Sequence, residues 1–135
     1  MPLVGNTTSG ALTRTRIADY IAASESVTPV AVTDAARVAT AAELFVSKLF
    51  TQTPTANRTF TTPTGAELAA GLTDEVVGSS FEFTIVNLAP STYTITLTAG
   101  ASGVTIVGAA AVQPATSGSF IGVFTAASTV SIYRK

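Results

Sequence analysis

The stretch SSFEFTIVNLAPSTYTITLTAG, residues 79–100, decides the fold class of this chain. Its first half alternates Phe and Ile with polar or smaller residues, and its second half alternates Tyr, Ile and Leu with threonines. A period of two puts successive side chains on opposite faces of a β-strand. Pro90 and Ser91, between the two halves, suit a tight connection. The stretch therefore predicts strands at 81–86 and 93–98 that pair as a hairpin.

Further short strands are predicted on both sides of this stretch. LFVSKLFTQ at 44–52 alternates, NRTFTTP at 57–63 suits a strand or edge strand, and GVTIVG at 103–108 is a strand bounded by glycines. Residues 117–127 and 128–135 predict another hairpin, with Phe120, Gly122 and Phe124 facing one way. Turn signals about every ten residues indicate an all-β sandwich or barrel. We expect an all-β fold, a jelly-roll-like β-sandwich with one short helix.

The short helix is predicted over TGAELAAGL, at 64–72. Thr64 and Glu67 have the spacing of a capping box, in which each side chain binds the backbone N–H of the other residue. Leu68 and Leu72 are four residues apart and share a helix face. We expect about two turns that cover one end of the sandwich. The same spacing at Thr40–Glu43 predicts a single helical turn.

Residues 1–35 differ from the body, which we predict to span 36–135. The segment shows little strand alternation, but in RIADYIAASES, at 16–26, the residues Ile17, Tyr20 and Ile21 fall at helical spacing. Such a short helix is not stable without a partner surface. We therefore expect an N-terminal arm that becomes ordered on a neighbouring protein, and a frayed terminus is the alternative. The candidate contact residues of the arm are Arg14, Arg16, Ile17 and Tyr20.

The composition argues against several classes of partner. Only 11% of residues are charged and the net charge is −1, so the clustered basic face that nucleic acid requires is not indicated. No segment is apolar over the roughly 20 residues of a membrane helix. The start MPLVGNTTSG lacks the basic and apolar regions of a signal peptide. We expect neither nucleic acid nor a membrane as a partner.

The residue types also argue against catalysis. The chain contains no histidine and no cysteine, so a serine nucleophile would lack its usual base, and thiolate or imidazole metal ligands are excluded. Asp74 and Glu75 are adjacent in a predicted loop, which is typical of a solvated turn, and the spacing around Glu82 does not support a glycosidase pair. We expect no enzyme activity, no cofactor, no metal and no small-molecule substrate.

Several phrases together resemble a known family. They are TQTPTANRTFTTPTGAELAAGL (51–72), VGSSFEFTIVNLA (77–89), TYTITLTAG (92–100), GVTIVGAAAV (103–112) and GSFIGVFTAASTVSIYRK (118–135). They are similar to small virion proteins of tailed bacteriophages and cyanophages, over roughly residues 37–135. The resemblance implies a capsid decoration or cement protein that sits as a homotrimer on the outer capsid surface and clamps neighbouring major capsid protein subunits. The first 36 residues fall outside it.

Two other functions remain open from the sequence. A head or tail fibre module could bind a host surface glycan or protein through exposed Tyr, Asn and Thr on loops. Copy number discriminates this function from cementing, because cement proteins are present in hundreds of copies per virion. A glycan hydrolase is the third hypothesis, and the scattered carboxylates argue against it.

Overall fold

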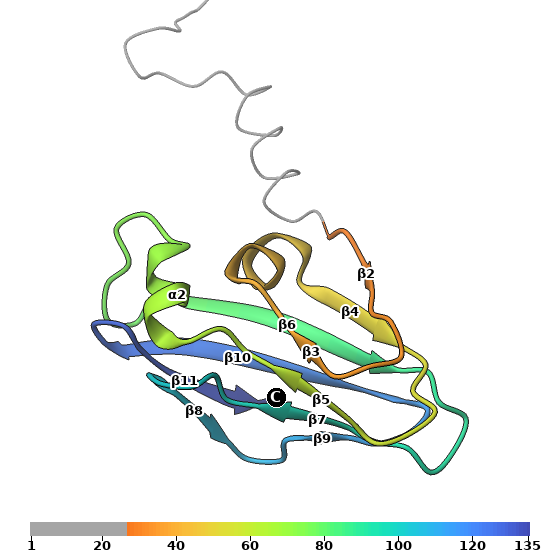
Figure 1. Cartoon of the computed structure of the whole chain (residues 1–135). Coiled ribbons are helices and arrows are strands. Elements are labelled where there is room, and N and C mark those ends of the chain that lie inside the picture. Colours follow the sequence, from red (N-terminus) through yellow and green to blue (C-terminus); the bar gives the residue numbers. More distant parts are fainter. Residues whose placement is uncertain (1–26) are drawn as a thin grey trace, which may run out of the picture.

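The alternating residues 80–87 form a central strand of the larger of two β-sheets. The computed structural model describes residues 27–135, and its larger sheet has six strands in the order β2-β4-β6-β10-β11-β8 (Figure 1). The strands are β2 (Val30–Ala31), β4 (Leu49–Gln52), β6 (Ser80–Asn87), β8 (Val104–Val107), β10 (Thr116–Ala126) and β11 (Thr129–Arg134).

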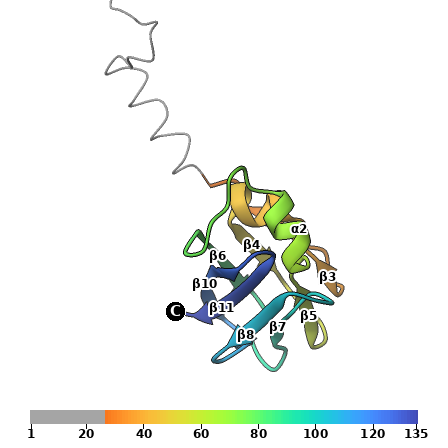
Figure 2. The same cartoon turned by 90° about the vertical axis from the view of Figure 1, so that its left-hand side faces the viewer.

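The second sheet has four strands in the order β3-β5-β7-β9 and packs against the first (Figure 2). Its strands are β3 (Arg37–Val38), β5 (Arg58–Thr61), β7 (Ile95–Thr98) and β9 (Ala111–Val112). The expectation of an all-β sandwich is therefore confirmed at the level of two packed sheets.

The strands from β2 to β9 alternate between the two sheets in chain order. Even-numbered strands lie in the six-stranded sheet and odd-numbered strands in the four-stranded sheet. Because the chain crosses to the opposite sheet and back between neighbours, β2 is parallel to β4, β4 to β6, β3 to β5 and β5 to β7. A jelly roll is built from antiparallel neighbours. The jelly-roll-like detail thus stays a prediction that these parallel pairs do not favour.

The hairpin predicted between 81–86 and 93–98 is wrong. The first of these segments, β6, pairs with β4 and β10, whereas the second, β7, pairs with β5 and β9 in the other sheet. Alternation predicts which face of a strand is buried, but it does not predict the neighbouring strand. Ile95 and Leu97 are buried as expected, and they reach the common core from the opposite side.

The core is built around Phe83 of β6. Its ring centroid lies 6.4 Å from that of Phe50 on β4, 5.4 Å from that of Phe120 on β10 and 6.5 Å from that of Phe60 on β5. All four side chains are at most 1% exposed. Because Phe60 belongs to the four-stranded sheet, this aromatic cluster joins the two sheets.

The strands predicted at 57–63, 103–108, 117–127 and 128–135 are confirmed. β10 and β11 form the C-terminal hairpin, with Phe120 and Phe124 buried on one side of β10. β8 lies between Gly103 and Gly108, and it runs parallel to β11. β5 is an interior strand of its sheet rather than an edge strand.

Helix α2 (Gly65–Ala70) confirms the predicted capping box. The backbone N–H of Glu67 donates to Thr64 Oγ1 at 3.2 Å, and the N–H of Thr64 donates to a carboxylate oxygen of Glu67 at 2.9 Å. The helix lies at one end of the sandwich, on the left in Figure 1, and buries Leu68 completely. A Cβ on Gly65 would stand 2.0 Å from the carbonyl oxygen of Ser128, so only glycine allows the helix to approach the β10–β11 turn this closely.

The strand predicted over 44–52 is only half correct. Residues 43–47 form a short π-helix, η1 (Glu43–Ser47), which buries Leu44. It follows a capping box at Thr40 and Glu43, as the spacing predicted. Lys48 takes a left-handed conformation with φ 63°, which ends the helix, and β4 begins at Leu49. A single buried turn carries too few residues for its period to be told from that of a strand.

The body extends further toward the N-terminus than predicted. Val30–Ala31 forms β2 at the edge of the six-stranded sheet. The buried side-chain amide of Gln52 donates to the carbonyl oxygens of Thr33 and Ala35, at 2.6 and 2.8 Å. Residues 30–35, predicted to belong to the arm, are therefore anchored on the sandwich.

Candidate interaction surface

One side of the six-stranded sheet faces away from the other sheet, and we name it the outer face. Its residues alternate with the buried core positions of each strand, so hydroxyl and aliphatic side chains dominate it. The outer face consists of Leu49, Thr51, Glu82, Thr84, Val86, Thr105, Val107, Ser117, Ser119, Ile121, Val123, Ser131 and Tyr133.

An apolar row crosses this face. The strand register places Val107 beside Tyr133, Tyr133 beside Ile121, and Ile121 beside Glu82. Tyr133 is 40% exposed and Val107 is 41% exposed. Three apolar side chains in line give a partner a continuous strip to bury, which single exposed apolar residues do not.

Charge is sparse on the outer face. The chain has no Asp, Glu, Lys or Arg between Glu82 and Arg134. Glu82 is paired with Lys135, with 2.6 Å between the Oε1 and Nζ atoms, and both side chains are about half exposed. An exposed pair of this kind adds little stability. The face can therefore be buried by a partner at little cost in desolvated charge.

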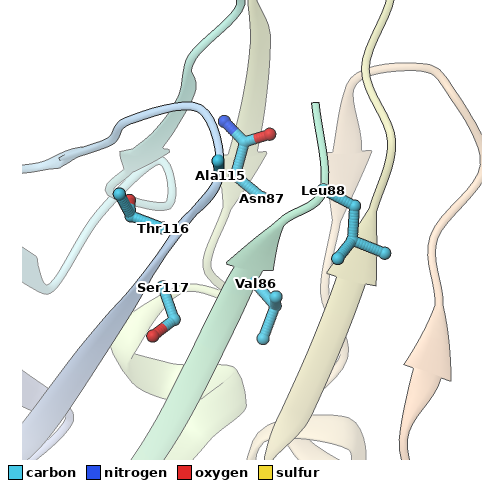
Figure 3. A pocket seen from close by; sticks show the side chains of 6 residues that line it. All are labelled: Val86, Asn87, Leu88, Ala115, Thr116 and Ser117. Atoms are coloured by element: carbon cyan, nitrogen blue, oxygen red, sulfur yellow. The ribbon is translucent and has the colours of Figure 1, made fainter. Parts of the chain in front are cut away.

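An open hollow of about 480 Å³ lies where β6 ends and β10 begins (Figure 3). Val86 and Ser117 line it from neighbouring strands, since they are partners in the strand register, and Leu88 and Ala115 line it from the adjoining loops. The hollow is lined by Val86, Asn87, Leu88, Ala115, Thr116 and Ser117. It offers hydroxyl and apolar groups but no charge.

The buried amide in this hollow is occupied by the fold itself. Nδ2 of Asn87 donates to the carbonyl oxygens of Tyr93 and Val112, at 2.8 and 3.0 Å, and Oδ1 accepts from the N–H of Ala89 at 3.0 Å. Asn87 thus holds the 88–94 connection against the four-stranded sheet. It is a structural residue rather than a ligand-binding one.

A second hollow, of about 320 Å³, lies where the described chain begins. Val27 is 48% exposed at its margin. Its lining comes from the start of β4, the middle of β6 and Val27: the residues are Val27, Lys48, Leu49, Glu82, Phe83 and Thr84. The described part of the chain thus begins at the margin of the outer face.

Among the carboxyl groups of residues 27–135, that of Asp34 has the most strongly shifted pKa, and Asp34 serves as an anchor. Its Oδ1 accepts from Nε of Arg58 at 2.8 Å and from the N–H of Thr55 at 3.1 Å, and the Thr55 hydroxyl donates to Oδ2. The hydrogen bond from Arg58, followed by those from Thr55, holds the pKa of Asp34 well below its usual range. A carboxylate kept ionised by such contacts ties two loops to β5 and is a poor proton donor.

The described residues contain no group of three or more His, Cys, Asp and Glu side chains that could hold a metal. Asp74 and Glu75 lie in the loop after α2, and Glu82 is engaged by Lys135. That the chain lacks enzyme activity and cofactors stays a prediction. Within residues 27–135, no helix is long and apolar enough to cross a membrane.

The predicted arm contacts Arg14, Arg16, Ile17 and Tyr20 lie outside the described residues. The outer face was not among the predicted sites. Its sequence signal is that Ile121 and Val123 are aliphatic although they alternate with buried Phe120 and Phe124, so both sides of β10 are apolar.

Comparisons with known proteins return nothing: no protein-family model, no curated protein and no solved structure matches this chain. A functional proposal therefore depends on the residues and surfaces described above.

Proposed function

We propose that this chain is a virion structural protein that decorates and cements the outside of a bacteriophage capsid. The observation that carries the proposal is the outer face, a neutral surface of hydroxyl and aliphatic groups with one ion pair, Glu82–Lys135. Such a surface suits burial against other protein subunits. The family resemblance of residues 37–135 supports the same role.

In this proposal the β-sandwich, with a jelly-roll-like topology, is the rigid body, and the N-terminal arm grips the shell. Arg14 and Arg16 would pair with carboxylates of the major capsid protein, and Ile17 and Tyr20 would bury apolar area there. Three arms in a homotrimer would engage together and raise the avidity. The host-binding fibre module remains the alternative.

Shell binding by the full-length chain tests the proposal. The assay uses capsids of the encoding virus prepared without this protein, and it compares the Arg14→Ala/Arg16→Ala variant with the Thr13→Ala/Thr15→Ala variant as control. Losing two charge-assisted hydrogen bonds should weaken binding about tenfold or more, whereas the control should bind like the unsubstituted chain.

Failure of the unsubstituted chain to bind these shells would overturn the cement role. Equal binding by the two variants would show that Arg14 and Arg16 do not contribute to shell binding. The copy number per virion separates the alternatives, because a few tens of copies at the tail or at fibre positions would favour the fibre module.

A further inference from the structure

We propose that residues 16–26 of the chain dock on the outer face of their own six-stranded sheet, with Ile17, Tyr20 and Ile21 covering the apolar row. The inference goes beyond the cement role, since it concerns the protein in the absence of a shell. Val27, the first described residue after this segment, already lies on the margin of the outer face beside Leu49 and Thr84.

The apolar pattern of the segment requires a partner surface. Ile17, Tyr20 and Ile21 share one face at helical spacing, and a helix of about 11 residues is not stable in water by itself. The surface closest along the chain is the second hollow, whose lining includes Leu49 and Phe83. Docking there would bury the apolar face of the segment without any other molecule.

The length of the segment also matches the distance across the strands of the outer face. A helix over 16–26 would be about 16 Å long, and three strand spacings across the sheet, from β4 to β11, come to about 14 Å. Tyr20 stands seven residues before Val27, about 10 Å along a helix, and Ile121 lies two strands from Leu49, also about 10 Å. Tyr20 can therefore reach Ile121, and Ile17 can reach Tyr133.

The charges permit the contact. The only carboxylate among the outer-face residues, Glu82, stands at the end of the apolar row and is about half exposed beside Lys135. Arg16, next to Ile17, would lie over β11, two strand spacings from Glu82, so docking does not depend on a new ion pair. On a capsid, the shell would then replace the outer face as the partner of Ile17 and Tyr20.

Disulfide trapping tests the docking in the full-length chain, which has no cysteine of its own. The Tyr20→Cys/Ile121→Cys variant is oxidised at low protein concentration. We expect most of it to form an intrachain crosslink that migrates faster on a denaturing gel and is reversed by reductant, because a disulfide needs Cα atoms within about 7 Å. The matched control, Tyr20→Cys/Thr98→Cys, places the second thiol at an exposed position of β7 in the four-stranded sheet and should crosslink at least tenfold less.

Crosslinking of the Ile121 pair no greater than that of the Thr98 pair would overturn the proposal. Crosslinks between chains would also overturn it, because the occupant would then be a second copy. The assay contains no shells, so its outcome and that of the shell-binding experiment are independent.

Trypsin cleavage provides a readout without cysteines. Docking should slow cleavage after Arg16, and Ile121→Glu, a change on the outer face, should speed it severalfold while leaving cleavage after Arg58 unchanged. Equal cleavage after Arg16 in the two proteins would contradict docking.

Discussion

At the scale of single residues, Asp34 shows how one carboxylate organises a loop. It accepts hydrogen bonds from Arg58 and from both the N–H and the hydroxyl of Thr55. Asp34 lies before β3, whereas Thr55 lies between β4 and β5, and Arg58 is the first residue of β5. The carboxylate therefore joins segments that are more than 20 residues apart, which no local sequence pattern indicates.

Replacement of Asp34 by Asn should lower the urea midpoint of unfolding at pH 7, because the ion pair with Arg58 and its charge-assisted hydrogen bonds are lost. The pKa of Asp34 is lowered in the fold, so its stabilising effect is present above the unfolded pKa of about 3.9 and is lost as the pH falls through the lower folded value. The difference from the unsubstituted chain should therefore shrink below about pH 4.

Asp74→Asn is the matched control for this prediction. Asp74 lies in the loop after α2, in a left-handed conformation with φ 59° that asparagine also tolerates. The urea midpoint of the Asp74→Asn variant should stay close to that of the unsubstituted chain. An Asp34→Asn deficit that is the same at pH 7 and at acid pH would show that the charge of Asp34 is not the cause.

At the scale of elements, the best-predicted feature is helix α2, because its signals are local. Thr64 and Glu67 form the capping box, and Leu68 is buried. Thr64→Ala should destabilise the protein by about 1 kcal/mol, because an N–H at the helix start loses its acceptor. Thr64→Ser keeps the hydroxyl and should cost much less. Urea unfolding measures both, and equal losses would show that the methyl group matters rather than the cap.

Strand pairing was predicted less well, for a physical reason. The β10–β11 hairpin has a short turn, so its two strands must lie side by side and pair with each other. The connection between β6 and β7 is longer, and Asn87 binds the carbonyl oxygens of Tyr93 and Val112 so that the chain passes to the other sheet. A turn signal marks where the chain bends but does not specify the plane in which it bends.

At the scale of the whole molecule, the two sheets are held together by the aromatic core. Phe83→Ala should destabilise the protein by about 3–5 kcal/mol, because the ring contacts aromatic side chains of both sheets and a cavity would remain. Phe83→Leu should cost less, since it fills part of the space. Thermal unfolding followed by circular dichroism measures both changes.

Val76→Ala, in the loop after α2 where Val76 is 66% exposed, is the control for these core variants. A surface substitution should change stability by no more than about 0.5 kcal/mol. If Val76→Ala destabilised the chain as much as Phe83→Ala, the loss would not be specific to the aromatic core.

The sequence by itself determined the fold class, the buried face of most strands, helix α2 and the scarcity of reactive side chains. These properties follow from the period of the apolar residues and from residue types, both of which are local. Only the tertiary structure decided that successive strands alternate between two sheets, that residues 43–47 are helical, and that Leu49, Ile121, Tyr133 and Val107 lie on one neutral face. Strand neighbours are set by long-range packing of the Phe83 core, which no window of the sequence contains.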